Sequence, residues 1–300
     1  MNINIVFQGN GILGIGYVGA VKALNENNYK IQRCAGTSSG SIIASLIAAG
    51  YDYSELDDII RNTDFRIFMK KTKLSKIFLI GSILSIIFNK GIYDGDIIED
   101  WIYNLLKKKH VTKFKDLMNA DKCRLKIIAS DITERRIMVL PDDLKKYNID
   151  PMEFSVAKAV RMSCSIPLYF TPYIIKNSSR CNFIVDGGLL DNFPICIFDT
   201  DEKSDCPTFG IKIKNTTGTT FKGKKDILSY LIDIVSAPSS CDPGMFIRNK
   251  DEARNITLDY SDKISATDFS KSNELIDYLC NVGYNAACNF IEKLDPDRCI

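Results

Sequence analysis

The sequence predicts an α/β domain in which helices cover a mainly parallel sheet. Near the start of the chain, short apolar runs that end close to glycines alternate with longer stretches whose apolar residues recur at helical spacing. Strands that alternate with helices in this way are joined by crossovers and form parallel sheets. No repeat, linker or low-complexity segment divides the 300 residues, so we expect one domain over residues 1–300.

The expected elements follow this pattern in order. The first 50 residues predict strand, helix, strand and helix, at 3–7, 15–24, 29–35 and 39–49. The second of these helices carries Ile42, Ile43, Leu46 and Ile47 at helical spacing and ends before Gly50. Further helices are expected at 54–61, 94–109, 155–162 and 275–294. Further strands are expected at 125–131, 137–140, 183–186 and 208–213, and a polar loop at 216–225.

Composition excludes several classes of function. The formal net charge is +2, from 39 basic and 37 acidic residues, whereas proteins that bind mainly through nucleic-acid phosphates are far more basic. The single histidine, His110, rules out a multi-histidine metal site, and the ten cysteines include no Cys-x-x-Cys pair. We therefore expect no nucleic-acid partner, no metal and no cofactor.

The sequence also bears on the compartment. The first residues lack the basic and apolar regions of a signal peptide, and no apolar stretch approaches the roughly 20 residues that span a bilayer. Unpaired thiols are typical of a reducing compartment. We expect a cytoplasmic protein, with any membrane contact peripheral.

A glycine motif lies between the first predicted strand and helix, as Gly9-x-Gly11-x-x-Gly14. Glycines let a ligand approach the backbone closely, and the unpaired N–H groups at a helix start attract an anion. That anion could be a dinucleotide pyrophosphate or a developing oxyanion, and a tight structural turn is the alternative. A dinucleotide site also requires an acid about 20 residues further on. Residues 34–37 are Cys-Ala-Gly-Thr, so the sequence disfavours a dinucleotide.

The missing acid is replaced by a second motif, Gly36-x-Ser38-x-Gly40, between a predicted strand and a predicted helix. This context is what a nucleophile elbow requires, because a sharp turn there exposes the serine hydroxyl. The following helix start favours negative charge. The alternative is that Ser38 or Ser39 only caps the helix.

A nucleophilic serine needs a base. His110 ends a run of three lysines, where it is expected to be a solvated surface residue and where like charge disfavours an imidazolium. Asp186 follows a predicted strand and precedes Gly187 and Gly188, so we favour this carboxylate, with an ordinary turn aspartate as the alternative. Because a carboxylate of normal pKa is a poor base for an alcohol, we expect Asp186 to lie in an apolar slot.

Together these motifs resemble those of the patatin-like phospholipases, in the same order along the chain. Three further blocks look like bacterial members of that family. They are Ser163-Cys164-Ser165-Ile166-Pro167 with Phe170 and Pro172, Asp191-Asn192-Phe193-Pro194, and Thr267-Asp268-Phe269. The resemblance covers nearly the whole chain, with core motifs within residues 3–200 and a closing C-terminal segment at 267–294, and is least over 64–93 and 201–266.

The resemblance implies a three-layer α/β/α fold and a serine–aspartate dyad without histidine. It implies that Ser38 is the nucleophile and Asp186 its base, supported by Gly36, Gly40, Gly187 and Gly188. It also implies an oxyanion hole in the first glycine motif, made from Gly9, Asn10, Gly11, Ile12 and Gly14. We place the donating N–H groups near Gly11 and Ile12.

This chain departs from the family pattern at two positions of the glycine motif. Many members have Lys or Arg before the last glycine, where this chain has Leu13, and Asn10 replaces a common glycine. Backbone donors do not depend on side-chain identity, so the oxyanion hole is expected to survive. The substitution bears instead on how an anionic head group is bound.

The implied activity is acyl-ester hydrolysis of a phospholipid or another acyl lipid. Two alternatives are a general esterase or lipase that uses His110 in a triad, and a lipid-binding relative without catalysis. The apolar stretch at 77–88 has Lys70, Lys71, Lys73 and Lys76 before it. It is too short to span a bilayer and is expected to be a buried helix, a lid or a lipid-contacting surface.

Overall fold

A computed structural model describes residues 1–77, 81–177, 180–199, 206–214, 237, 249–260 and 272–294. Its strands are β1 Asn2–Phe7, β2 Lys30–Thr37, β3 Gly91–Tyr93, β4 Met118–Asn119, β5 Lys122–Cys123, β6 Leu125–Asp131, β7 Arg136–Leu140, β8 Leu168–Phe170, β9 Tyr173–Asn177, β10 Arg180–Asp186, β11 Thr208–Lys214 and β12 Asn255–Asp259. The helices are α1 Gly16–Glu26, α2 Ser39–Ala48, α3 Tyr53–Asn62, α4 Gly81–Asn89, α5 Asp96–Lys108, α6 Val156–Ser163, α8 Asn249–Glu252 and α9 Ser272–Leu294. The expected loop at 216–225 and the block at 267–269 lie outside the described residues.

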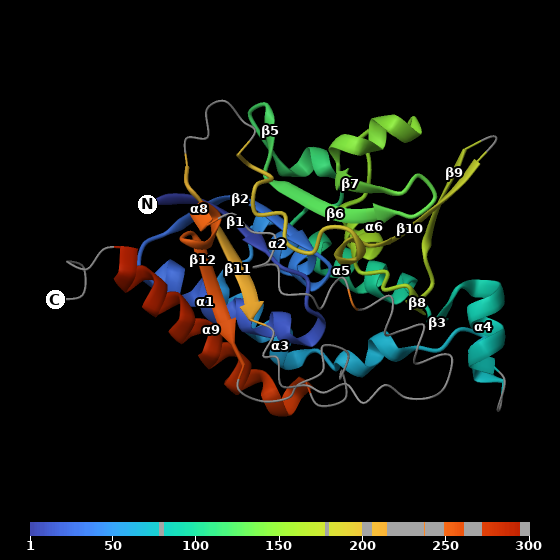
Figure 1. Cartoon of the computed structure of the whole chain (residues 1–300), viewed down its shortest axis with the longest axis horizontal. Coiled ribbons are helices and arrows are strands. Elements are labelled where there is room, and N and C mark those ends of the chain that lie inside the picture. Colours follow the sequence, from blue (N-terminus) through green and yellow to red (C-terminus); the bar gives the residue numbers. More distant parts are fainter. Residues whose placement is uncertain are drawn as a thin grey trace.

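A central sheet organises the molecule (Figure 1). Its strand order is β12-β11-β1-β2-β6-β10-β9, and β7 pairs with β6 as a hairpin. The pairs from β12 to β6 are parallel, whereas β10, β9 and β7 pair antiparallel. Helices flank this sheet, with α1 against α9 and with α2 and α6 against its central strands. The predicted α/β class with a mainly parallel central sheet is confirmed.

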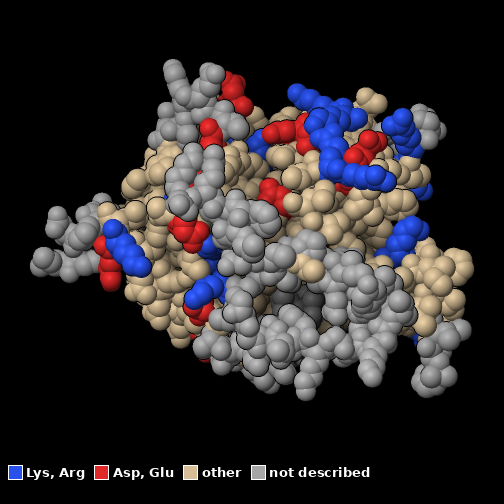
Figure 2. All heavy atoms as spheres, viewed as in Figure 1, with Lys and Arg blue, Asp and Glu red and all other residues tan. Residues whose placement is uncertain are grey.

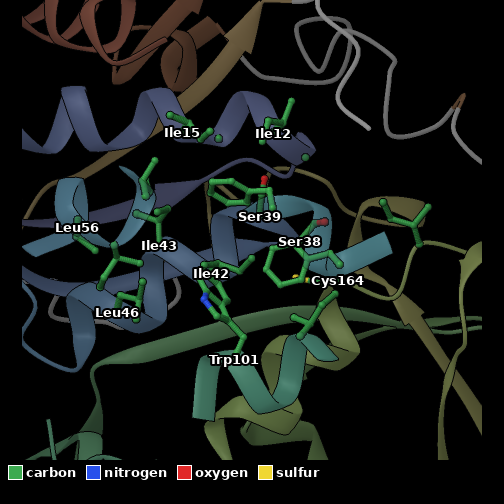
Figure 3. Close-up of a pocket in the computed structure, with 18 of the residues that line it drawn as sticks. Ile12, Ile15, Ser38, Ser39, Ile42, Ile43, Leu46, Leu56, Trp101 and Cys164 are labelled. Atoms are coloured by element: carbon green, nitrogen blue, oxygen red, sulfur yellow. The ribbon is translucent and has the colours of Figure 1, made fainter. Parts of the chain in front are cut away.

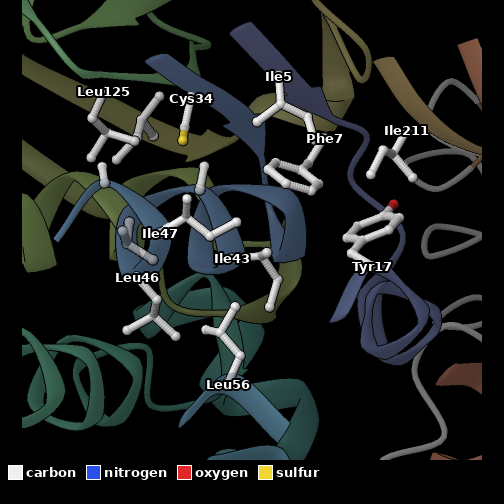
Figure 4. Packing of buried hydrophobic residues seen from close by; sticks show 14 of the residues in the cluster. Ile5, Phe7, Tyr17, Cys34, Ile43, Leu46, Ile47, Leu56, Leu125 and Ile211 are labelled. Atoms are coloured by element: carbon white, nitrogen blue, oxygen red, sulfur yellow. The ribbon is translucent and has the colours of Figure 1, made fainter. Parts of the chain in front are cut away.

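Side chains from the sheet and from α2 form the main core (Figure 4). Ile5 and Phe7 alternate with residues of the opposite face along β1, as expected of a strand buried on both faces. They share one buried cluster with Ile43 and Ile47 of α2. The buried Tyr17 hydroxyl donates a hydrogen bond to the Gln8 carbonyl at 2.7 Å. This packing fixes α2 under the edge of the sheet where β1 and β2 end.

Most of the elements that the sequence predicted lie within two residues of their expected bounds. A 3-10 helix at Gly11–Ile15 precedes α1, so the first glycine motif is mostly helical rather than a loop. The two- and three-residue strands β3, β4, β5 and β8 and the short helix α8 were not expected from the sequence, and neither were the longer strands β9 and β12. Strands β9 and β12 are each five residues long and gain their strand geometry by pairing with β10 and β11, respectively. Among the described residues, no helix has both the length and the apolar character needed to cross a bilayer.

Strands β2 and β10 both pair with β6, and both end beside the middle of that strand. Thr37, the last residue of β2, is paired with Ile128, and Asp186, the last residue of β10, is paired with Ala129. Because β2 runs parallel to β6 and β10 runs antiparallel, their carboxyl ends converge on adjacent residues of one strand. This register brings together two chain segments that are 148 residues apart in sequence.

Candidate active site

Ser38 occupies a sharp turn between β2 and α2. Its backbone has φ 51° and ψ −126°, a conformation that is strained for a residue with a side chain. No side-chain cap hydrogen bond forms at Ser38, so the helix-cap alternative does not describe it. The side chain is instead directed to Asp186, and the residue is 8% exposed. A strained turn of this kind is the geometry of a nucleophile elbow.

Asp186 accepts hydrogen bonds on both carboxylate oxygens. The Ser38 hydroxyl donates to Oδ2 at 2.6 Å, and the Gly188 N–H donates to Oδ1 at 2.7 Å. The residue is 6% exposed. Burial raises the pKa of Asp186 from 3.8 to about 7, even though both hydrogen bonds act to lower it. The carboxyl is therefore withdrawn from water, in the kind of slot that the sequence analysis predicted for Asp186.

Glycines allow the elbow to pack this tightly. A Cβ on Gly36 would overlap the Gly40 carbonyl, and a Cβ on Gly40 would lie 2.5 Å from the Phe7 carbonyl oxygen. A Cβ on Gly187 would overlap the Ile128 carbonyl of β6. Close backbone approach therefore leaves no room for a side chain at Gly36, Gly40 and Gly187, on both sides of the Ser38–Asp186 pair.

The first glycine motif lies against Ser38, and only some of its backbone N–H groups already have a hydrogen-bond acceptor. The Gly9 N–H donates to the Asn192 carbonyl at 3.1 Å, and the Asn10 N–H donates to Ser39 Oγ at 3.1 Å. Gly14 packs on Ser39, where a Cβ would lie 2.9 Å from Oγ. Among the described residues, none accepts a hydrogen bond from the N–H groups of Gly11 and Ile12. Both residues line the pocket beside Ser38.

A deep apolar pocket opens from Ser38 (Figure 3). Ile42 and Leu46 follow Ser38 at successive turns of α2, so this wall extends about 12 Å from the serine. In Figure 3, Leu56 of α3 lies at the end of the pocket away from Ser38, and Trp101 of α5 lies next to Ile42. Besides residues of the first glycine motif and Ser39, the remaining lining residues are apolar: Ile15, Ile43, Ile59, Ile60, Phe65, Phe68, Ile98, Cys164, Ile166 and Phe170. The space beside the serine is therefore lined mainly by apolar side chains.

Two residues that the sequence analysis gave no role hold this arrangement. Ser163 Oγ accepts the Ser38 N–H at 2.8 Å and donates to the Ile128 carbonyl at 2.5 Å. The Asn192 Nδ2 group donates to the Gly9 carbonyl at 2.9 Å. Both lie in blocks that resembled the family, which was the only available signal. Pocket residues from α3 and α5 carried no motif signal.

His110 is not part of this arrangement. It is exposed, has a left-handed backbone with φ 57°, and follows α5, where its N–H donates to the Lys107 carbonyl. Among the described residues, Asp186 is the acceptor of the Ser38 hydroxyl. The geometry therefore disfavours the triad alternative.

One cluster of possible metal ligands exists in the described part of the chain, formed by Cys196, Asp199 and Asp251. Arg254 already lies among them. Its Nη2 donates to Asp199 at 2.7 Å, to Asp251 at 2.8 Å and to the Cys196 sulfur at 3.5 Å. The guanidinium of Arg254 therefore pairs with both carboxylates, and this cluster forms an ion-pair network.

The mainly parallel central sheet with flanking helices defines the class of α/β proteins, and the candidate site lies where its strands β2 and β10 end. A model of the family described as "Patatin-like phospholipase" matches residues 5–199. The chain belongs to the patatin-like phospholipase family and is, at the level of that family, a lipid hydrolase.

Several known proteins are similar to this chain. YqhO of Bacillus subtilis, described as uncharacterized, is 41% identical over 213 residues, which cover 71% of this chain and 72% of that protein. R571 of Acanthamoeba polyphaga mimivirus, also described as uncharacterized, is 26% identical over 97% of this chain and 94% of its own length. A probable lipid hydrolase, 463L of Invertebrate iridescent virus 6, is 26% identical over 64% of this chain and 62% of its own length.

Solved structures show the same fold. VipD from Legionella pneumophila superposes with a TM-score of 0.56 at 16% identity, covering 97% of this chain and 67% of that one. The type III effector ExoU superposes with a TM-score of 0.50 at 14% identity, covering 97% of this chain and 53% of that one.

Proposed function

We propose that this protein is a phospholipase A-type acyl hydrolase in which Ser38 is the nucleophile and Asp186 is the general base. The observation that carries the proposal is the 2.6 Å hydrogen bond from the Ser38 hydroxyl to a buried carboxylate whose pKa is raised to about 7. A base of this pKa suits proton transfer near neutral pH. The apolar pocket beside Ser38 supports an acyl chain as the substrate group.

The proposed reaction has two halves. Asp186 takes the Ser38 proton while Oγ bonds to the ester carbonyl carbon, giving a tetrahedral oxyanion. The N–H groups of Gly11 and Ile12 are the proposed donors to that oxyanion, and the start of α2 adds a favourable dipole. The carbon–oxygen bond to the leaving alcohol then breaks, and the alcohol takes the proton from Asp186. Water repeats the sequence, releasing the fatty acid and restoring Ser38.

The proposal assigns the oxyanion contacts to fewer residues than the family resemblance implied. Gly9 and Asn10 have other acceptors for their N–H groups, so we assign them to the shape of the loop. Gly14 is assigned to packing on Ser39. Loss of one oxyanion donor typically costs about 10²- to 10³-fold in rate. The scheme uses no metal, so a chelator is expected to leave hydrolysis unchanged.

Labelling with a fluorophosphonate probe tests the proposal. We expect mass spectrometry to find the label on Ser38, no label in Ser38→Ala, and labelling slowed about 100-fold or more in Asp186→Asn. Ser45→Ala is the matched control, because it removes another buried hydroxyl from α2, and it should label normally. His110→Gln should also label normally.

Two results would overturn the mechanism. Normal labelling of Asp186→Asn would remove the aspartate from its role as base. Absence of label on the wild type, both in solution and on phospholipid vesicles, would instead support a lipid-binding relative without catalysis.

A further inference from the structure

The helix α4 has its apolar side turned outward. Ile83 is 54% exposed, Ile87 60% and Phe88 66%, and the preceding Ile77 is 48% exposed. We call these four residues the α4 surface. The buried residues of the helix are Gly81 and Ser85. A helix on the surface of a globular protein normally has the opposite arrangement, with its apolar stripe facing the core.

The inward side of α4 is fixed by polar contacts. The Ser85 hydroxyl is fully buried and donates to the Gly91 carbonyl at 2.6 Å. Thr72 Oγ1 lies 2.6 Å from Ser85 Oγ, and the Asn89 amide donates to the same oxygen at 3.3 Å. A rotation that buried the isoleucines would break these buried hydrogen bonds. The outward apolar side is therefore built into the packing of the helix.

Basic residues flank this helix in the sequence. Between Asp64 and Asp94 the chain has no acidic residue and six basic ones. Five of these are exposed lysines: Lys70, Lys71, Lys73, Lys76 and Lys90. Figure 2 shows the α4 region as an uncharged area at the right edge of the view, with basic side chains beside it. An overall charge of only +2 makes this a local concentration of positive charge.

The same segment is anchored to the wall of the pocket at both ends. Phe65 and Phe68 precede it and line the pocket, and β3, which follows α4, pairs with β8 next to Phe170. Backbone hydrogen bonds tie the two ends together, from Thr72 N–H to the Ile92 carbonyl and from Asp94 N–H to the Lys70 carbonyl. A surface that contacts α4 is therefore held next to the pocket that contains Ser38.

We propose that the α4 surface and its lysines dock this protein on an anionic phospholipid bilayer. Exposed isoleucine and phenylalanine side chains gain free energy by leaving water for the acyl region, while lysines are attracted to anionic head groups. A bilayer with anionic head groups binds the apolar side chains and the lysines at the same time. An apolar groove on a protein would bind only the apolar side chains, so the lysines favour the bilayer. The inference rests on the proposed function, since the bilayer supplies the acyl-lipid substrate.

Flotation with vesicles measures docking separately from catalysis. Ser38→Ala protein is used, so that lipid is not hydrolysed during the experiment. We expect binding to vesicles of phosphatidylcholine with phosphatidylserine, and binding at least about tenfold weaker to phosphatidylcholine alone. Adding Ile83→Asp and Ile87→Asp should weaken binding about 50-fold or more. Adding Lys73→Gln and Lys76→Gln instead should weaken it about tenfold, on anionic vesicles only.

Matched controls place the same changes elsewhere. Ile132→Asp with Leu294→Asp adds two acids at exposed apolar positions outside the segment, and Lys108→Gln with Lys145→Gln removes two exposed lysines. Both should bind like the parent protein. In the background with Ser38 intact, all four double variants should hydrolyse a monomeric short-chain ester at the parent rate, which shows that the fold and the site are preserved.

Three outcomes would overturn the inference. The first is parent-like binding by the Ile83→Asp, Ile87→Asp variant, and the second is no binding of the parent to either vesicle. The third is a parent protein that is a dimer and does not bind vesicles, while the Ile83→Asp, Ile87→Asp variant is a monomer. This result would identify the α4 surface as a contact between two copies of the chain. Failure of the proposed function would appear differently, as lack of monomeric ester hydrolysis with vesicle binding retained.

Discussion

The hydroxyl of Ser163 holds the backbone of Ser38, accepting its N–H at 2.8 Å. The same hydroxyl donates to the Ile128 carbonyl at 2.5 Å, so one side chain joins α6, β6 and the turn after β2. Ser163 is fully buried. Because Ser38 has a strained backbone, this contact helps to keep its hydroxyl directed at Asp186.

Removing this contact should impair turnover more than substrate binding. In Ser163→Ala the buried N–H of Ser38 loses its acceptor, at a cost of about 1–3 kcal/mol. We expect kcat for a monomeric ester to fall about tenfold or more, with KM changed less than about threefold. Ser165→Ala is the matched control, because it removes a neighbouring buried hydroxyl while its carbonyl still accepts the Asp186 N–H. Equal losses of kcat in the two variants would contradict the role given to Ser163.

Hydrolysis should depend on pH through Asp186. The carboxyl must be ionised to accept the Ser38 proton, and burial raises its pKa to about 7. We therefore expect kcat/KM to be constant above about pH 8 and to fall roughly tenfold per unit well below pH 7. A stopped or continuous assay with a monomeric ester between pH 5 and pH 9 measures this. A profile that remains flat down to pH 5 would show that a group of normal carboxylate pKa, or none, is the base.

The same buried carboxyl should cost stability at high pH. Its folded-state pKa lies above the unfolded value, so the folded state binds more protons between about pH 4 and 7, and stability falls as pH rises through that range. Asp186→Asn removes this penalty. We expect the variant to have a free energy of unfolding higher by up to about 4 kcal/mol at pH 8.

Chemical denaturation at two pH values separates this effect from a general change in packing. The difference between Asp186→Asn and wild type should shrink as pH falls and approach zero below about pH 3, where the wild-type carboxyl is protonated in both states. A difference that does not change with pH would mean that burial of charge is not its cause.

The depth of the pocket should set the preferred acyl chain. Leu46 lies about 12 Å along α2 from Ser38 and is 1% exposed. Leu46→Phe fills this part of the pocket, so we expect kcat/KM for a decanoate ester to fall about tenfold or more, with a butyrate ester affected less than about threefold. Leu46→Met conserves volume and should leave both rates nearly unchanged. Equal losses on both esters would place the acyl chain elsewhere.

Local patterns were sufficient for much of this protein. The glycines around Ser38 and Asp186, and the apolar runs before them, predicted strand ends with sharp turns, because those requirements lie within a few residues of each motif. The run from Ile77 to Phe88 predicted a helix but left its role open. Periodicity cannot reveal which side of a helix is buried when nearly all its residues are apolar. The structure decided this by burying Ser85 and exposing Ile83 and Ile87.

By itself, the sequence determined the class of fold, the two strand-end motifs and the expectation that a carboxylate rather than the lone histidine serves Ser38. Only the tertiary structure decided that β10 runs antiparallel to β6, so that Asp186 ends opposite Ala129, next to the Ile128 that pairs with Thr37. It also decided which N–H groups beside Ser38 are already bonded, and where the pocket extends. The physical reason is that strand register and hydrogen-bond partners depend on contacts between distant segments, whereas motifs and periodicity report only on residues close together in the chain.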